Sequence, residues 1–405
     1  MKRTGLLRPL GHVSAAVLLL ALSQACSGPS VASIADAPNT PFKLATFEAG
    51  GRTRVGLVLG TQVVDAVEAN AALTQSAGLS KVEIPGEMKA LIEQYDGIKS
   101  RLYQIANHFG DPAVAATKPA FAFDFSQVSV KAPVKYPWNV LAAAANYRAH
   151  AEGMGAPGAR PGTPATPPAA SNAPPAGNAP PAGAARPPAG FNASAAALID
   201  PDRDAPVFFA KSPRSCIIDP GDAYYIPPGR ERIDWEGELA IVIGKAAYLV
   251  AKDKTHDYVF GYSIMYDVSD RAGRKREVAM FSGPNWFDGK SIDRGAPFGP
   301  VIVPKEFLKD PYNLALTTKV NGVTKQEGNT KDLIWKENHM ISFLTSVLTL
   351  YPGDVISTGT PSGTGAERQE FLKPGDVVSI DIEGIGTLTT PIKAIADRAG
   401  MPSTP

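Results

Sequence analysis

The stretch from Asp234 to Gly244 constrains the fold of this chain more than any other. It reads Asp-Trp-Glu-Gly-Glu-Leu-Ala-Ile-Val-Ile-Gly, and its aliphatic and β-branched residues closing on a glycine predict a strand. Alternate side chains of a strand share a face, so Glu236 and Glu238 are expected to project together. The residues after them are apolar on both faces, which is typical of a buried strand. Two buried carboxylates side by side are costly unless a cation lies between them.

A second predicted strand supplies another carboxylate. Taken alone, a Glu-x-Glu pair is usually a solvated strand end, and that interpretation stays open for Glu236 and Glu238. The segment from Gly261 to Ser269, however, also has the pattern of a strand and carries Asp267 near its end. Three hard oxygen ligands, with positions left for water and substrate, suit Mg²⁺, Mn²⁺ or Ca²⁺ rather than zinc. The sequence therefore predicts a divalent-cation site formed by Glu236, Glu238 and Asp267.

Eight short motifs follow one another along the chain: Lys211-Ser212-Pro213, Ile226-Pro227-Pro228, Asp234-x-Glu236-x-Glu238, Gly261-Tyr262 to Asp267-Val268-Ser269-x-Arg271, Gly289-Lys290-Ser291, Asn321-Gly322, Pro352-Gly353-Asp354 and Thr358-Gly359-Thr360-Pro361. This series resembles the fumarylacetoacetate hydrolase family from about residue 143 to residue 395, interrupted by one insertion. The resemblance implies an α+β, mainly β fold, in which a mixed β-roll catalytic domain follows a small N-terminal α+β domain. It also implies a homodimer. Periodicity alone predicts only a strand-rich α+β protein.

The resemblance implies roles for side chains around the predicted ion. The ion would chelate a 2-oxo acid through its carboxylate and neighbouring oxygen, and would stabilise negative charge on an enolate. Lys290 would neutralise the same charge, and the Thr360 hydroxyl would hold the substrate carboxylate. Tyr147 and Arg271 are expected to contact the substrate, although Arg271 opens a charged stretch that by itself predicts a solvated helix or loop. The expected partner is a small 2-oxo or 2,4-dioxo acid.

A histidine motif predicts the group that moves protons. The segment from Asn146 to His150 matches a family motif in which the histidine works with a glutamate three residues later to activate water. That later position is Gly153 here, with Glu152 beside it. We expect His150 and Glu152 to form the proton-transfer pair, because imidazole moves protons near neutral pH and a carboxylate partner fixes its tautomer. The departure at Gly153 weakens the case for hydrolysis more than the case for metal binding.

Three functions are compatible with these residues. The first is a metal-dependent hydrolase that cleaves a C–C bond of an acylpyruvate or a related diketo acid. The second is a hydratase, isomerase or decarboxylase of 2-oxo acids, and the third is an exported protein that captures a ligand at the metal site without turnover. Two other chemistries are excluded. The chain has no Gly-x-Ser-x-Gly motif, and its glycine-rich stretch at 359–365 lacks the Gly-Lys-Ser/Thr ending of a phosphate loop.

The first 25 residues are expected to be a signal peptide (1–25). Basic residues precede an apolar run at 13–22, and the small residues at 23–25 offer a cleavage site. The run is shorter than the ~20 apolar residues of a membrane-spanning helix. Cys26 follows immediately, as in bacterial lipoproteins. The mature chain is therefore expected to be exported, either to the periplasm or to a membrane through a lipid anchor on Cys26.

Length and composition predict two domains after this leader. A chain of 405 residues with 44% hydrophobic residues can bury two cores, and its net charge of +1 offers no case for nucleic acid as a partner. We expect a flexible tether at 26–41, a small domain at 42–130 that includes a helix from Met88 to Phe109, and a catalytic domain at 131–398. The Ala-, Pro- and Gly-rich stretch at 155–190 interrupts the catalytic domain. Such a composition forms no core, so this insertion is predicted to be disordered at the surface.

Overall fold

The computed structural model describes residues 34–153, 197–272 and 285–398. Three predicted features lie outside the described residues: the signal peptide at 1–25, the lipid anchor at Cys26 and the insertion at 155–190. Of the predicted tether, only its last part, from Ile34, is described. Within the described ranges, no helix is long and apolar enough to cross a membrane.

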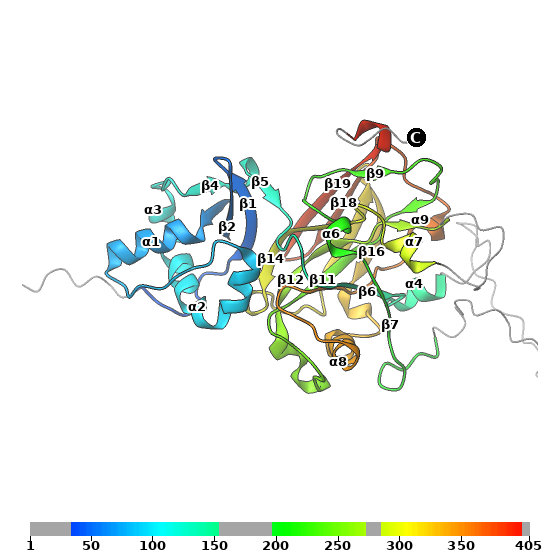
Figure 1. The fold of residues 1–405 in the computed structure, drawn as a ribbon, viewed down its shortest axis with the longest axis horizontal. Coiled ribbons are helices and arrows are strands. Elements are labelled where there is room, and N and C mark those ends of the chain that lie inside the picture. The colour runs from blue at the N-terminus through cyan, green and yellow to red at the C-terminus, as the bar shows by residue number, and fades with distance from the viewer. Residues whose placement is uncertain (1–33, 154–196, 273–284, 399–405) are drawn as a thin grey trace, which may run out of the picture. The chain divides into compact units, whose positions relative to one another are not determined.

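A mixed sheet of twelve strands is the largest element of the fold (Figure 1). Its main order is β4-β3-β2-β1-β14-β12-β11-β17-β6-β7, while β5 pairs with β1 and β8 pairs with β14. Neighbouring strands are antiparallel except for the pairs β17–β6 and β14–β8. The strands are β1 (Lys43–Ala49), β2 (Arg52–Leu59), β3 (Gln62–Asp65), β4 (Ala122–Asp124), β5 (Ser129–Lys131), β6 (Val140–Ala144), β7 (Val207–Ala210), β8 (Ile217–Ile218), β11 (Gly237–Ile243), β12 (Val259–Tyr266), β14 (Ala296–Pro304) and β17 (Val355–Ser357).

A five-stranded sheet packs against β11 and β12 of the large sheet. Its order is β16-β15-β18-β19-β9, and a separate two-stranded sheet pairs β10 with β13. The strands are β9 (Tyr224–Ile226), β10 (Ile233–Asp234), β13 (Ser269–Asp270), β15 (Ala315–Val320), β16 (Val323–Asn329), β18 (Val377–Ile382) and β19 (Gly386–Ala394). One apolar core joins the two larger sheets, with Leu239 and Ile264 from the first and Ile380 and Leu388 from the second. These packed sheets confirm the predicted α+β, mainly β class.

Outside the N-terminal part the described α-helices are short, with at most 11 residues. The α-helices are α1 (Ala66–Ala77), α2 (Met88–Phe109), α3 (Pro112–Ala115), α4 (Arg148–Gly153), α6 (Pro213–Cys216), α7 (Trp286–Lys290), α8 (Glu337–Val347) and α9 (Gly365–Arg368). The 3₁₀ helices are η1 (Phe125–Gln127), η2 (Lys252–Tyr258), η3 (Lys305–Phe307), η4 (Thr330–Asp332) and η5 (Ile395–Asp397). The predicted helix from Met88 to Phe109 is confirmed as α2. It packs with α1 on β2, because its apolar residues recur at helical spacing and form one buried face.

The N-terminal strands and the strands of the predicted site belong to the same sheet. Strand β1 pairs with β2 along its whole length and meets β14 at the pair Leu44–Ile302. A second apolar core follows this junction, joining α1 and α2 to one face of β11, β12 and β14. The predicted division between 42–130 and 131–398 stays a prediction.

The predicted strand from Asp234 to Gly244 is broken in two. Strand β10 ends at Asp234 and pairs with β13, whereas β11 begins at Gly237 and pairs with β12. At Gly237 the chain passes so close to the five-stranded sheet that a Cβ atom would lie 2.3 Å from Thr318 Oγ1. Only glycine fits there. Glu236 therefore lies at the break, and its direction is set by this change of sheet rather than by strand alternation.

Candidate active site

Three buried carboxylates meet where β11 begins and β12 ends. The antiparallel pairing of Gly237 with Tyr266 places Glu236 and Glu238 beside the residue that follows β12, Asp267. One oxygen atom from each of the three carboxylates lies within 4.8 Å of the other two. The structure thus brings together the three carboxylates that the sequence predicted, although Glu236 and Asp267 lie just outside the strands.

Two lysines are bonded to carboxylates of this cluster. Lys290, the last residue of α7, donates from Nζ to Glu236 Oε2, to Asp267 Oδ2 at 2.6 Å and to Ser269 Oγ at 2.6 Å. Lys211 Nζ donates to Asp267 Oδ1 at 2.5 Å. Both ammonium groups are buried. Asp267 is therefore neutralised on both of its oxygens by lysines from two different segments.

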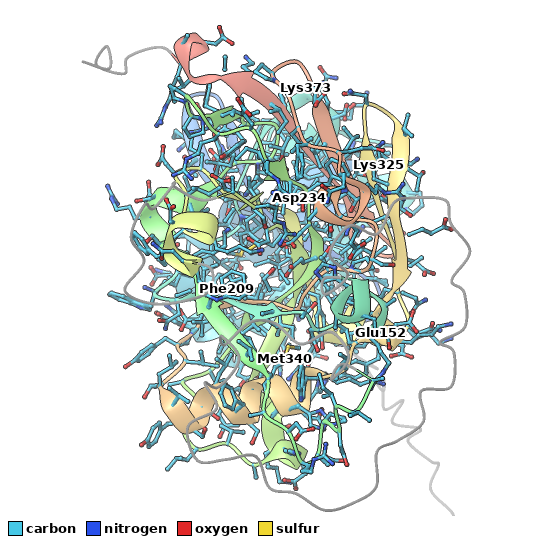
Figure 2. All side chains as sticks on the ribbon, turned by 90° about the vertical axis from the view of Figure 1, so that its right-hand side faces the viewer. Glu152, Phe209, Asp234, Lys325, Met340 and Lys373 are labelled. Carbon is cyan, nitrogen blue, oxygen red and sulfur yellow. The ribbon has the colours of Figure 1, made fainter. Side chains whose placement is uncertain are left out.

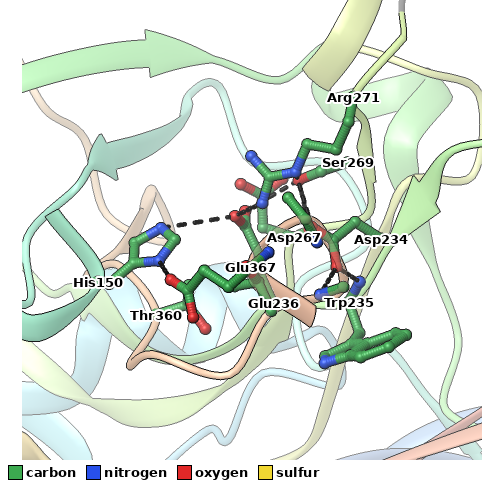
Figure 3. Close-up of polar contacts among 12 residues, drawn as sticks. His150, Asp234, Trp235, Glu236, Asp267, Ser269, Arg271, Thr360 and Glu367 are labelled. Carbon is green, nitrogen blue, oxygen red and sulfur yellow. Dashed lines mark hydrogen bonds and ion pairs between the residues drawn. The ribbon is translucent and has the colours of Figure 1, made fainter. Parts of the chain in front are cut away.

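An arginine links this cluster to its surroundings (Figure 3). Arg271 Nε donates to Asp234 Oδ2 at 2.7 Å, and Arg271 Nη2 is bonded to Glu236 Oε1. Asp234 also accepts from the backbone of α9, at Gly365 N and at Ala366 N, the latter at 3.0 Å. Of the charged stretch that was predicted to be solvated, only residues 271 and 272 are described, and the Arg271 side chain is held between two buried carboxylates.

The charges around the three carboxylates are unequal. Burial alone would raise the pKa of Glu236, but the charges of Arg271 and Lys290 outweigh it and hold that pKa well below its usual range. Burial, together with the carboxylates of Asp267 and Glu236, raises the pKa of Glu238 to about 8. No described lysine or arginine forms an ion pair with Glu238, whose Oε2 accepts instead from Ser357 and Gly359. Positive charge is missing on the Glu238 side of the cluster.

This imbalance fits a divalent cation. The donor set consists of carboxylate oxygens only, which suits Mg²⁺, Mn²⁺ or Ca²⁺. An ion held by Glu236, Glu238 and Asp267 would supply the charge that Glu238 lacks and would favour its ionised form. The residues present therefore fit the predicted ion.

A small cavity opens onto this cluster. It is lined by Ala143, Ala144, Ala145, His150, Phe209, Glu236, Glu238, Arg271, Trp286, Lys290 and Thr360. Phe209 and Trp286 are stacked with ring centroids 5.2 Å apart, and the three alanines are small and apolar. The cavity is thus lined by both charged and apolar side chains. They are in contact with each other, since Lys290 Nζ lies 4.9 Å from the centroid of the Phe209 ring. Figure 2 shows Phe209 on β7.

His150 lies beside the acidic cluster. It lies in α4 and is 3% exposed, with Nε2 3.9 Å from Glu236 Oε1. Its Nδ1 lies 2.5 Å from Glu367 Oε1 (Figure 3). A carboxylate only accepts hydrogen bonds, so Nδ1 carries the proton and donates it to Glu367. The remaining nitrogen, Nε2, lies on the side of the acidic cluster.

The predicted pairing of His150 with Glu152 is not formed, and this prediction is wrong. Glu152 is exposed, and within the described residues it has no hydrogen bond or ion pair. The physical reason is helical geometry, because residues two apart in a helix point to different sides. Figure 2 shows Glu152 on α4. The carboxylate that meets the imidazole comes instead from Glu367, 217 residues later in the chain.

Of the two remaining residues predicted to contact the substrate, Thr360 lines the cavity and Tyr147 does not. Thr360 lines the cavity, but its hydroxyl donates to the Gly237 carbonyl at 2.9 Å and accepts from Gln326 Nε2 at 2.8 Å. Its proton is therefore engaged with the backbone. Tyr147 is buried and does not line the cavity, and its hydroxyl has no hydrogen-bond partner among the described residues.

Sequence reasoning missed the parts played by Lys211 and Glu367. Lys211 appeared only as a member of the Lys-Ser-Pro motif, and that motif was the signal that could have pointed to it. Glu367 follows the glycine-rich stretch at 359–365, and nothing in its spacing relates it to His150. The contact depends on Asp234, which fixes the start of α9.

The sequence is similar to one family model and to several known proteins. Residues 139–393 match the family model described as fumarylacetoacetate (FAA) hydrolase C-terminal. The mitochondrial oxaloacetate tautomerase of Xenopus laevis is 38% identical over 189 residues, which are 46% of this chain and 58% of that protein. An uncharacterized protein of Methanocaldococcus jannaschii is 44% identical over 188 residues, 46% of this chain and 73% of that protein. The match thus spans little more than half the length of the tautomerase.

A solved structure resembles the chain over most of its length. The maleylpyruvate hydrolase of Sphingobium sp. SYK-6 is 26% identical, with a TM-score of 0.56, over 87% of this chain and 99% of that one. The same hydrolase has also been solved in complex with manganese (II) ion and pyruvate. The family model covers more than half of the 405 residues and includes every residue of the acidic cluster. The chain therefore belongs to the fumarylacetoacetate hydrolase family of enzymes.

Proposed function

We propose that this protein is a divalent-metal-dependent hydrolase that cleaves a C–C bond of an acylpyruvate, a 2,4-dioxo acid. The observation that carries the proposal is the meeting of three buried carboxylates with the His150 imidazole, whose Nε2 lies 3.9 Å from Glu236 Oε1, at one cavity. A cation site beside a proton-transfer group provides the two parts that this hydrolysis needs. The Sphingobium hydrolase, solved with manganese and pyruvate, supports the same class of substrate.

Glu236, Glu238 and Asp267 would hold the ion, for which we propose Mg²⁺ or Mn²⁺. When bound, such an ion supplies Lewis acidity against negative charge on the oxygens of a 2-oxo acid. Lys290 and Arg271 line the same cavity and add fixed positive charge that stabilises an anionic substrate and its enolate. Burial would lower the pKa of Lys290, but the charges of Asp267 and Glu236 raise it, so Lys290 stays an ammonium ion and is no base.

We assign proton transfer to His150. Nε2 takes a proton from a water molecule while the water oxygen bonds to the C4 carbonyl carbon of the substrate. The C3–C4 bond then breaks, the acyl group leaves as a carboxylic acid, and C3 of the pyruvate enolate takes up a proton. One water is consumed, and one carboxylic acid and one pyruvate are formed. Of the described residues that line the cavity, His150 is the only imidazole.

The apolar part of the lining supports an acyl group without charge. Ala143, Ala144, Phe209 and Trp286 line the same cavity as the carboxylates and the cations. A 2,4-dioxo acid has a charged end and an acyl end, so it matches a cavity lined by both charged and apolar side chains. We therefore propose substrates in which the acyl group is alkyl or aryl, in preference to those with a second carboxylate at that end.

A second candidate function is keto–enol tautomerisation of a 2-oxo acid such as oxaloacetate. The observation that favours it is the 38% identity to the oxaloacetate tautomerase of Xenopus laevis, within a match that covers 58% of that protein. Tautomerisation moves a proton between carbon and oxygen and consumes no water. It needs the same ligands and the same imidazole, and it differs only in what the imidazole acts upon.

The test is a turnover assay on the purified chain with two substrates. Acetylpyruvate is supplied with Mg²⁺ or Mn²⁺, and pyruvate is measured with lactate dehydrogenase, while ketonisation of oxaloacetate is followed by its ultraviolet absorbance. The proposal predicts one pyruvate for each acetylpyruvate, loss of activity with EDTA, and recovery when the ion is restored. Tautomerisation without pyruvate release would replace the first function by the second. Binding of acetylpyruvate without either reaction would identify a capture protein and contradict both.

A further inference from the structure

We propose that this protein binds a fatty acid in a second cavity, with the carboxylate against the Lys43 ammonium and the alkyl chain along β14. This second cavity, here called the Lys43 pocket, has a volume of about 740 Å³. Sites for small molecules commonly measure ~300–1,000 Å³. The Lys43 pocket and the active-site cavity have no lining residue in common. The proposal is therefore independent of the reaction proposed above.

Strand alternation places the Lys43 pocket on one face of the large sheet. Leu44 of β1 pairs with Ile302 of β14, and both belong to the core that includes α1 and α2. Successive side chains point to opposite faces of a strand, so Lys43, Val301 and Val303 project from the other face. These three residues line the pocket. The pocket thus lies on the face of β1 and β14 opposite the N-terminal helices.

Most of the other residues that line the Lys43 pocket are apolar. Val58 lies directly opposite Lys43 in the pairing of β1 with β2. Phe307 packs on Phe42 with ring centroids 4.8 Å apart, and the two valines of β14 are almost fully buried. Thr389 of β19 is exposed, so this part of the lining faces solvent. The pocket therefore offers a buried apolar floor that can be reached from outside.

Lys43 is the only charged residue among the described residues that line the pocket. Its Nζ donates to the Ile385 carbonyl at 3.0 Å, and within the described part of the chain it forms no ion pair. Partial burial lowers the pKa of Lys43, and the charge of Asp381 offsets this only in part. Asp381 does not line the pocket, and its carboxylate accepts from the Thr387 hydroxyl instead. An ammonium has three donors, so Lys43 can still bind an anion.

These features together favour one class of ligand. A carboxylate bound to Lys43 would form a charge-assisted hydrogen bond and would offset the desolvation of the ammonium. The apolar lining favours an alkyl chain, because burial removes apolar surface from water. With one cation and no acidic side chain among the described lining residues, the pocket suits a single negative charge. A fatty acid has one carboxylate at the end of an apolar chain and matches each of these features.

The first experiment compares four probes by isothermal titration calorimetry on the full chain. Octanoate, used below its critical micelle concentration, is expected to bind one molecule per chain. Octanol has the same chain without the charge and is expected to bind about tenfold more weakly, because a hydrogen bond to a charged group is lost. Octylammonium and acetate, which lack the negative charge or the chain, are expected not to bind. Oxalate with Mn²⁺ is expected to leave the octanoate affinity unchanged.

The second experiment changes the charge and the space separately. Lys43→Met keeps an apolar side chain and is expected to weaken octanoate ~10–10²-fold, with little effect on octanol. Lys393→Met is the matched control, because Lys393 is an exposed lysine of β19 that does not line the pocket, and it should bind octanoate like the wild type. Thr389→Trp places a large ring at the exposed part of the lining and is expected to weaken octanoate and octanol alike.

Several results would overturn the proposal. Wild-type protein that binds no octanoate does so directly, and equal losses in Lys43→Met and Lys393→Met would reduce the effect to net charge. Displacement of octanoate by oxalate and Mn²⁺ would place it in the active site instead. Sedimentation that shows a dimeric wild type and a monomeric Thr389→Trp would identify a second copy of the chain as the occupant. Circular dichroism confirms folding, and Lys43→Met decides the question if Thr389→Trp does not fold.

Discussion

Two regions of the molecule each contain a histidine paired with a glutamate, and their surroundings are opposite. At the cavity, His150 is 3% exposed and its Nδ1 bonds to Glu367, with Nε2 facing the acidic cluster. Beside α8, His256 Nδ1 lies 3.0 Å from Glu337 Oε1, but the imidazole is 58% exposed. There the carboxylate is the buried partner, and it also accepts from Tyr262 at 2.6 Å.

The difference shows that a histidine–glutamate contact has no fixed meaning. A buried carboxylate needs hydrogen-bond donors, and His256 and Tyr262 supply them to Glu337. At the cavity the relation is reversed, because the imidazole is the more deeply buried partner and Glu367 bonds only to its Nδ1. Nε2 of His150 is therefore available to other groups. What the second nitrogen faces therefore separates a structural pair from a functional one. Nε2 of His150 faces carboxylates at a cavity, whereas most of the His256 ring faces solvent.

The largest effect on turnover is expected at one of the two histidines and not at the other. His150→Ala should lower turnover of an acylpyruvate by ~10²–10⁴, the usual contribution of general acid–base catalysis, while Mn²⁺ affinity stays the same. His256→Ala should leave kcat within about twofold, because its ring contacts no residue of the cavity. Steady-state kinetics and calorimetry on both variants check this. Equal losses would abolish the distinction between the pairs.

The next effect should appear in stability rather than in rate. Glu337→Gln removes a buried charged acceptor from Tyr262 and His256, and we expect the free energy of unfolding to fall by about 1–3 kcal/mol. Turnover per folded molecule should be unchanged. Urea denaturation and kinetics on the same sample test both parts. A tenfold loss of kcat in fully folded Glu337→Gln protein would show that this pair also serves the reaction.

A smaller effect is expected in the pH dependence of stability, and it tests the unbalanced charge of Glu238 at the cavity. Burial, with Asp267 and Glu236 nearby, raises the pKa of Glu238 to about 8 from 4.5, so folding favours its protonated form. The stabilisation that protonated Glu238 contributes is fully present below about pH 4.5, and it is lost as the pH rises through about 8. We expect the melting temperature of the metal-free protein to fall across this range relative to Glu238→Gln, and Mn²⁺ to remove the fall. Parallel curves for the two proteins would contradict this.

The smallest effect is expected at Glu152. Its side chain is exposed, and Glu367 already occupies the place beside His150. Glu152→Gln should therefore change kcat by less than about twofold, as is usual for surface substitutions. Kinetics of Glu152→Gln beside Glu367→Gln decide which carboxylate acts with the imidazole. A loss at Glu152 as large as that at Glu367 would restore the partner that the sequence suggested.

Local pattern predicted much of this molecule. The β-branched run after Glu238 gave β11, apolar residues at helical spacing gave α2, and the three acidic residues of the cluster were identified from two strands. These features depend on neighbours in sequence or on one pair of adjacent strands. The break at Glu236 could not be predicted, since it arises where Gly237 passes close to Thr318 on another sheet.

Contacts between distant segments were beyond local pattern. Glu367 reaches His150 because Asp234 holds α9, and Lys211 reaches Asp267 across 56 residues. Neither contact produces a periodic pattern in the sequence, because each depends on how three or more segments come together in the fold. The neighbour that the sequence offered in place of Gly153 was Glu152, which is exposed, whereas the carboxylate that contacts His150 comes from Glu367.

The proposed function depends first on a divalent-cation site formed by Glu236, Glu238 and Asp267. The most direct measurement is anomalous scattering at the manganese edge from crystals grown with Mn²⁺. We predict one strong peak among the oxygens of these three side chains, and no such peak in Glu238→Gln crystals. A wild-type crystal at saturating Mn²⁺ with no peak there, and with the Lys290 ammonium still bonded to Glu236 and Asp267, would contradict it.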